Sequence, residues 1–122
     1  MRGNTYSKNH NFFEAKSDYE FWDFSFEQMG DIDLPTTIDY VLRVTQKPQL
    51  SLFGFSQGTT IGFYSLVNQK SRLQGKIRTF LAIAPVITLK YSSQEFLRQL
   101  SSNIAVPFLL EQGGYYELFS ER

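Results

Sequence analysis

The chain has 122 residues, of which 42% are hydrophobic and 16% aromatic, and its twelve basic residues balance twelve acidic ones. This composition is typical of a globular chain and excludes disorder throughout, because disordered segments are poor in aromatic and branched apolar residues. A net charge of zero leaves no surplus positive charge to neutralise phosphates, so we predict no nucleic-acid partner. With no cysteine and one histidine, His10, the chain offers neither a disulfide nor a zinc cluster, and we predict no metal and no cofactor.

Targeting and membrane signals are not found in the chain as written. Residues 1–10 are polar and do not contain the apolar stretch of a secretory signal. No run approaches the roughly 18 apolar residues that a membrane helix requires, so we predict no transmembrane segment. We therefore expect a soluble cytosolic product, unless the authentic beginning of the protein is missing from this sequence.

The first predicted elements are a loop, an aromatic cluster and a helix. Residues 1–20 are polar and mixed, which predicts a loop with a turn at Gly3. The run Phe21–Phe26 is dense in aromatic side chains, and we interpret it as buried packing rather than as a catalytic feature. A helix is predicted from Asp33, with Pro35 in its first turn. Its apolar residues recur at spacings of three and four, at Leu34, Ile38, Val41 and Leu42.

Two predicted strands follow, with a second helix between them. Pro48 ends the helical pattern, and residues 49–53 form a short apolar run of strand length. The helical spacing returns after Gly58, and residues 76–84 predict a second buried strand that stops at Pro85. This order predicts an α/β fold with a parallel sheet and helices on both faces. Further along, residues 92–100 fit a helix and residues 104–110 form an apolar stretch.

The most informative motif is the G-x-S-x-G pentapeptide Gly54-Phe55-Ser56-Gln57-Gly58, which lies between a predicted strand and a predicted helix. This is the context of a nucleophile elbow, in which a strained turn raises a serine above the sheet. The two glycines are needed because a Cβ at either position would collide with neighbouring backbone. We predict Ser56 to be the nucleophile, with φ above zero or another sparsely populated conformation. We predict the backbone N–H of Gln57 to be one donor of an oxyanion hole.

An ordinary strand-to-helix turn is the simpler interpretation of such a pentapeptide, but the flanking strand and helix patterns favour the elbow. The surrounding stretch resembles the acid lipases, the lysosomal and gastric lipase family of α/β-hydrolases. Five blocks are similar to blocks of that family and occur in the same order: Arg2-Gly3-Asn4-Thr5-Tyr6-Ser7, Phe21-Trp22-Asp23-Phe24-Ser25-Phe26, Asp33-Leu34-Pro35, residues 52–60, and Leu81-Ala82-Ile83-Ala84-Pro85-Val86. The family usually carries histidine where this chain has Phe55, at a position that is not the triad histidine.

The resemblance implies a partial α/β-hydrolase fold, with a mostly parallel sheet that is flanked by helices and incomplete at both ends. It implies a hydrolase core over residues 1–91 and the start of a truncated cap or lid region over residues 92–122. It also implies hydrolysis of carboxylic ester bonds in neutral lipids, such as acylglycerols or sterol esters. In that reaction Ser56 is acylated and then released by water, and members of the family are secreted or lysosomal.

The other members of a catalytic triad are not found after the serine. In this fold the acid and then the histidine follow the nucleophile along the chain. Residues 57–122 contain no histidine and no aspartate, and their glutamates lie in segments unlike the family's acid turn. His10 precedes Ser56, and we interpret it as a surface residue. The family's histidine-glycine loop, which supplies the second oxyanion donor, is also absent. Loss of one such donor costs about a hundredfold in turnover and loss of the base costs more, so we expect little or no hydrolysis from this polypeptide alone.

Three functions therefore stay open at the level of sequence. The chain is part of an active lipase, or a non-catalytic lipid-binding or interaction protein that retains the elbow, or an esterase or thioesterase on the same scaffold. A truncated sheet exposes strand edges and apolar faces, so we also expect poor soluble expression.

Overall fold

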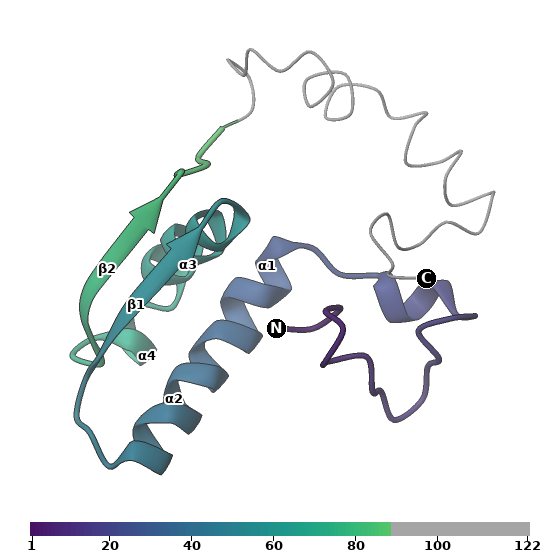
Figure 1. Cartoon of the computed structure of the whole chain (residues 1–122), viewed down its shortest axis with the longest axis horizontal. Coiled ribbons are helices and arrows are strands. Elements are labelled where there is room, and N and C mark those ends of the chain that lie inside the picture. Colours follow the sequence, from purple (N-terminus) through teal and green to yellow (C-terminus); the bar gives the residue numbers. More distant parts are fainter. Residues whose placement is uncertain (89–122) are drawn as a thin grey trace. The chain divides into compact units, whose positions relative to one another are not determined.

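A computed structural model describes residues 1–88, which form a small α/β arrangement (Figure 1). The predicted features over residues 92–122 lie outside this part of the chain. None of the helices within residues 1–88 is long and apolar enough to cross a membrane. In chain order the elements are a 3-10 helix η1 (Tyr19–Trp22), helix α1 (Phe26–Gln28), a π-helical turn η2 (Met29–Asp33), helix α2 (Leu34–Thr45), strand β1 (Leu50–Phe55), helix α3 (Gln57–Asn68), helix α4 (Lys70–Leu73) and strand β2 (Ile77–Ile83).

The two strands pair in parallel, which confirms that part of the predicted fold. Leu52 lies opposite Phe80 and Phe55 lies opposite Ile83, and α3 with α4 forms the crossover that a parallel pair requires. Strand β1 extends two residues further than the predicted run, through Gly54 and Phe55. The first two residues of the pentapeptide therefore belong to the strand, and the last two belong to α3.

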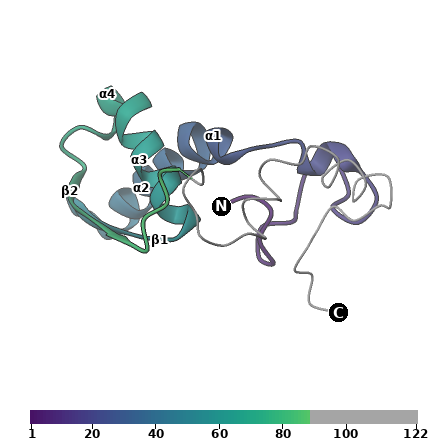
Figure 2. The same cartoon turned by 90° about the horizontal axis from the view of Figure 1, so that it is seen from above.

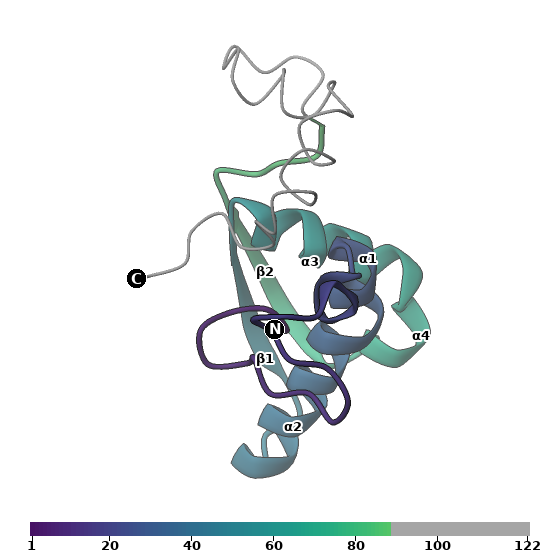
Figure 3. The same cartoon turned by 90° about the vertical axis from the view of Figure 1, so that its right-hand side faces the viewer.

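The helices cover one face of this sheet, as Figures 2 and 3 show from two directions. The hydrophobic core joins α2, α3 and α4, with partly buried side chains of both strands packed against it. Its buried residues are Leu34, Ile38, Ile61 and Leu73, and Met29, Leu42, Leu50, Leu52 and Ile77 pack around them. Apolar side chains at helical spacing gather on one side of α2, and its buried Leu34 and Ile38 belong to the core against which side chains of both strands pack.

The opposite face of the sheet is uncovered within residues 1–88, which differs from the prediction of helices on both faces. Side chains alternate along a strand, so those that do not face α3 point to the other side. Phe53 and Phe55 of β1 are 62% and 63% exposed, and Leu81 and Ile83 of β2 are 53% and 44% exposed. The expectation of a fully buried second strand is therefore wrong for this part of the chain, where the apolar run is covered on one side.

The helix predicted from Asp33 corresponds to α2, which begins at Leu34, but helical backbone that was not predicted precedes it from Phe26. Ser25 caps α1: its hydroxyl accepts a hydrogen bond from the backbone N–H of Glu27, and its own backbone N–H donates to Gln28. The turn η2 then joins α1 to α2, so the helical chain runs continuously from Phe26 to Thr45 (Figure 1). Asp33 has helical backbone angles and does not cap the helix. Pro35 is tolerated in the first turn of α2 because the preceding π-helical turn already departs from the α-helical hydrogen-bond pattern.

The N-terminal segment is a series of turns up to η1, as predicted for residues 1–20. In the aromatic run that follows, Phe21 is buried and forms an edge-to-face contact with Trp22 at 4.9 Å between ring centroids. The indole N–H of Trp22 donates to the carbonyl of Ala15 at 2.9 Å. Phe26 is 38% exposed. The interpretation of this run as buried packing thus holds for Phe21 and only in part for its neighbours.

Candidate active site

Ser56 occupies a sharp turn between the last residue of β1 and the first residue of α3 (Figure 1). Its φ of 51° and ψ of −120° lie in a region that residues other than glycine rarely adopt. The sequence prediction of a positive φ at this position is confirmed. Ser56 is exposed, so the pentapeptide does not bury its serine and does not lie inside one regular element. Such a backbone costs about 1–3 kcal/mol and persists where the surroundings hold it in place.

The small residues around the turn allow β1 and α3 to approach closely. A Cβ at Gly54 would lie 2.9 Å from the carbonyl oxygen of Gly58 and 3.0 Å from the ring of Phe80. At Gly58 a Cβ would meet nothing within 4 Å, so the collision predicted there is not found. Gly62, one turn further along α3, was not singled out from the sequence, yet its Cβ would lie 2.4 Å from the Phe80 ring. The close approach of β1 to α3 therefore depends on Gly54, whereas Gly62 leaves room for the Phe80 ring of β2.

Gln57 begins α3, and its backbone N–H is one of the first four of the helix, which have no acceptor inside a helix. The N-terminal end of a helix carries partial positive charge. An N–H beside Ser56 at this end is the geometry expected of an oxyanion donor. Its role as a donor to substrate stays a prediction, as does the role of Ser56 as nucleophile.

Two threonines directly after the pentapeptide tie the turn to the chain that leaves β2. The Thr59 hydroxyl donates to the carbonyl oxygen of Ser56 at 2.6 Å and accepts the backbone N–H of Val86 at 2.9 Å. The Thr60 hydroxyl donates to the carbonyl oxygen of Val86 at 2.6 Å, and the N–H of Ser56 donates to the carbonyl of Ile83 at 3.1 Å. These threonines were not predicted from the sequence, although hydroxyl side chains in the first turn of a helix often bond to nearby backbone.

Within residues 1–88, no carboxylate or imidazole hydrogen-bonds to the Ser56 hydroxyl. His10 is exposed, as predicted, and its ring stacks on Phe13 at 4.9 Å between centroids. Its Nδ1 accepts the backbone N–H groups of Phe12 and Phe13 at 3.2 and 3.1 Å. The lone pair of Nδ1 is therefore already engaged, and the imidazole stabilises a local turn.

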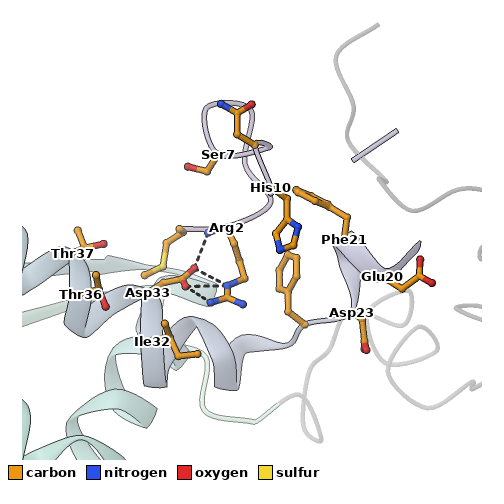
Figure 4. A pocket seen from close by; sticks show the side chains of 13 residues that line it. Arg2, Ser7, His10, Glu20, Phe21, Asp23, Ile32, Asp33, Thr36 and Thr37 are labelled. Atoms are coloured by element: carbon orange, nitrogen blue, oxygen red, sulfur yellow. Dashed lines mark hydrogen bonds and ion pairs between the residues drawn. The ribbon is translucent and has the colours of Figure 1, made fainter. Parts of the chain in front are cut away.

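A hollow of about 710 Å³ lies between the N-terminal segment and the start of the long helix (Figure 4). Arg2 and Asp33 meet in it. The guanidinium donates to the carboxylate at 2.6–3.1 Å, and the backbone N–H of Arg2 adds a bond of 2.7 Å. Burial of Asp33 works to raise its pKa, but the hydrogen bonds and charge of Arg2 outweigh this and leave the pKa below its usual value. Ser56 does not line this hollow, so the hollow is separate from the elbow.

An exposed serine on a positive-φ turn, between a parallel strand and a helix, is the arrangement of a nucleophile elbow. The chain is 46% identical to bovine gastric triacylglycerol lipase over 95 residues, which are 78% of this chain and 23% of that protein. It is 41% identical to human lipase member J over 97 residues, or 80% of this chain and 26% of that protein. It is 44% identical to rat lysosomal acid lipase/cholesteryl ester hydrolase over 92 residues, or 75% of this chain and 23% of that protein.

Over most of its length the chain is homologous to the gastric and lysosomal acid lipases, which confirms the family resemblance predicted from its motifs. It spans about a quarter of the length of these curated relatives. No protein-family model matches the chain.

Proposed function

We propose that this chain carries the nucleophile segment of a lipase-like serine hydrolase that cleaves carboxylic ester bonds of neutral lipids. The observation that carries the proposal is the exposed Ser56 at φ 51°, followed at once by a helix N-terminus. The names of the relatives, triacylglycerol lipase and cholesteryl ester hydrolase, support this substrate class. The fold proposed for the whole protein is an α/β-hydrolase, with a core over residues 1–91 and a cap or lid that begins within residues 92–122.

The chemistry assigned to the elbow is acyl transfer in two steps. The Ser56 oxygen attacks the ester carbonyl while a base takes its proton, which produces a tetrahedral intermediate with a negative oxygen. The N–H of Gln57, at the positive end of α3, stabilises that oxygen, and departure of the alcohol leaves an acyl-Ser56 that water hydrolyses. Residues 57–122 contain neither aspartate nor histidine, and their glutamates lie in segments unlike the family's acid turn, so we expect the acid and the base outside these residues. The 122 residues alone are expected to hydrolyse esters poorly.

The second candidate is a non-catalytic lipid-binding or interaction protein that retains the elbow as a structural turn. The observation in its favour is the Ser56 hydroxyl, which in residues 1–88 donates no hydrogen bond to an imidazole or a carboxylate. A serine hydroxyl without a base is a weak nucleophile.

Labelling with a fluorophosphonate, which phosphonylates activated serines, distinguishes the two candidates. We expect slow labelling at Ser56 in the 122-residue chain and fast labelling in a longer product that carries an acid and a histidine downstream. Ser56→Ala should abolish the adduct, and Ser51→Ala, which changes an exposed serine of β1, should leave it unchanged. Fast labelling that survives Ser56→Ala would overturn the proposal. A longer product whose Ser56 stays unmodified would favour the non-catalytic candidate. Hydrolysis of emulsified triacylglycerol and cholesteryl ester, compared with soluble thioesters, then tests the substrate class.

A further inference from the structure

Two residues with left-handed backbone lie on either side of the contact between the elbow and the end of β2. Ser56 has φ 51° and Ala84 has φ 47°, and neither is a glycine. One hydrogen bond joins the two turns, from the N–H of Ser56 to the carbonyl oxygen of Ile83, the residue before Ala84. Such conformations persist where the surrounding structure determines them from several directions. Residues that contact both the turn at Ser56 and the turn at Ala84 are therefore the candidates for holding these backbones in place.

Thr59 contacts both turns through a single buried hydroxyl. Its side chain is completely buried, with no exposed surface. A threonine hydroxyl has one hydrogen to donate and lone pairs to accept with. It donates to the carbonyl oxygen of Ser56 at 2.6 Å and accepts the N–H of Val86 at 2.9 Å. Each function of the hydroxyl is thus used on a different side of the contact.

Thr60 completes the attachment from the next position of α3. Its hydroxyl donates to the carbonyl oxygen of Val86 at 2.6 Å, so both polar backbone groups of Val86 are bound by threonine side chains. We call Thr59, Thr60 and Val86 the threonine clamp. It fixes the chain that leaves β2 against the first turn of α3, next to Ser56.

The planar peptide group links this clamp to the proposed chemistry. The carbonyl of Ser56 and the N–H of Gln57 belong to the same peptide unit, and in a trans peptide they point in opposite directions. A hydroxyl that holds the Ser56 oxygen therefore also fixes the direction of the Gln57 N–H. The N–H of Thr59 donates to the same oxygen at 2.9 Å, so two donors determine this orientation.

We propose that Thr59 and Thr60 are positioning residues of the elbow. Thr59 orients the Ser56–Gln57 peptide so that its N–H faces the reacting carbonyl, and Thr60 holds the chain after β2 as a wall beside the serine. This proposal rests on the proposed function only where it assigns the Gln57 N–H the role of an oxyanion donor. The hydrogen bonds of the two threonines do not depend on any reaction.

The test compares Thr59→Val with Thr59→Ser, and Thr60→Val with Thr60→Ser, in the 122-residue chain. Valine keeps the shape of threonine without the hydroxyl, whereas serine keeps the hydroxyl. Amide hydrogen exchange at Val86 should become roughly tenfold faster in Thr59→Val, since one net hydrogen bond is worth about a factor of ten, and should change little in Thr59→Ser. NMR at Ser56 should show a changed N–H to Hα coupling and Cα shift in Thr59→Val alone. Thr60→Val should speed exchange at Val86 less, because that N–H keeps its own acceptor.

A further variant keeps the test informative if Thr59→Val does not fold. Ala84→Gly removes the steric cost of the left-handed backbone after β2. The double variant Thr59→Val/Ala84→Gly should then fold and still show the altered Ser56 signals. In a product that labels rapidly with fluorophosphonate, Thr59→Val should reduce kcat by about tenfold to a hundredfold with little change in KM, because the N–H acts on the transition state.

Equal exchange at Val86 in Thr59→Val and Thr59→Ser, or unchanged Ser56 signals in both, would overturn the proposal. The exchange and NMR measurements require no turnover, so they separate it from the proposed function. If the clamp behaves as expected while Ser56 is never labelled, the proposed function fails alone. If Ser56 reacts equally well in wild type and Thr59→Val, and exchange is unchanged, the clamp fails alone.

Discussion

The two faces of the β1–β2 sheet are built from similar apolar side chains but have different surroundings within residues 1–88. On the inner face, Leu52 packs against the core and the Phe80 ring lies 5.2 Å from that of Phe63 on α3. On the outer face, Phe53 and Leu81 pair across the strands at 62% and 53% exposure. An apolar strand sequence therefore predicts burial on both faces of the sheet, whereas the covering helices determine which face is buried within residues 1–88.

The largest difference in the free energy of unfolding is expected between substitutions of a buried and of an exposed branched residue in α2. Ile38 is 2% exposed, and Ile38→Ala should lower the free energy of unfolding by about 2–5 kcal/mol, through lost burial and the cavity left behind. Val44, also in α2, is 61% exposed, and Val44→Ala should change it by less than about 0.5 kcal/mol. Urea denaturation measures both. Equal losses would contradict the assignment of the core to one side of α2.

A second test uses adjacent residues of β1 that face opposite sides. Gly54→Ala places a methyl group 2.9 Å from the Gly58 carbonyl oxygen and should cost about 1–3 kcal/mol, because backbone must move. Phe55→Ala removes a side chain that is 63% exposed and should cost clearly less. If Phe55→Ala is the more damaging change, the outer face is covered in the folded protein.

Much of this arrangement was predictable from the sequence because local signals agreed with one another. Pro48, the apolar run and the glycines located the strand, the turn and α3 within two residues, and the motif predicted the positive φ at Ser56. Asp33 and Pro35 located the start of α2 at Leu34, but the helical backbone that precedes α2 from Phe26 was not predicted. Asp33 is instead bound by Arg2, and an unmarked π-helical turn continues the helix through this region.

The site was predictable only where a known motif marks it. The glycines of the pentapeptide indicated close packing, but no sequence rule showed that Gly62, rather than Gly58, meets the Phe80 ring. The contacts of Thr59 and Thr60 with Val86 join residues 26 or 27 positions apart, and a sequence without its register does not show such pairs. The positions of long-range polar contacts therefore required the fold.

A third prediction tests how much the contact between Arg2 of the N-terminal segment and Asp33 contributes to the free energy of unfolding. Asp33→Asn should lower the free energy of unfolding at pH 7 by roughly 1–2 kcal/mol, because the bonds from Arg2 to a carboxylate are charge-assisted. Since the pKa of Asp33 is lowered in the folded state, its contribution is present above the unfolded pKa of about 4 and is lost as the pH falls through the folded pKa. Urea denaturation from pH 7 to pH 2 should show wild type and variant converging in acid. Asp23→Asn is the exposed control, and a pH-independent difference would contradict the prediction.

The smallest stability effect is expected on the outer face. Phe53→Ser removes a ring that is 62% exposed, so the free energy of unfolding should change by less than about 0.5 kcal/mol. The same change should reduce self-association and the binding of a hydrophobic dye, because a contiguous apolar surface promotes both. Light scattering and dye fluorescence measure these effects. A large stability loss with unchanged dye binding would show that this face is occupied.

The π-helical turn at Met29–Asp33 determines the directions in which its side chains point from the helix that runs from Phe26 to Thr45. Asp31 accepts hydrogen bonds from the Tyr64 hydroxyl and the Gln69 amide, at 3.1 and 2.9 Å, while Asp33 faces Arg2. Each residue of an α-helix advances the direction of its side chain by about 100°. A π-helical turn holds about one residue more than an α-helical turn, so deleting the exposed Ile32 would regularise the backbone and change the direction of Asp31 relative to Tyr64 and Gln69. The number of residues in this turn is consequently constrained as well as the identity of its side chains. The composition of the turn does not indicate this constraint.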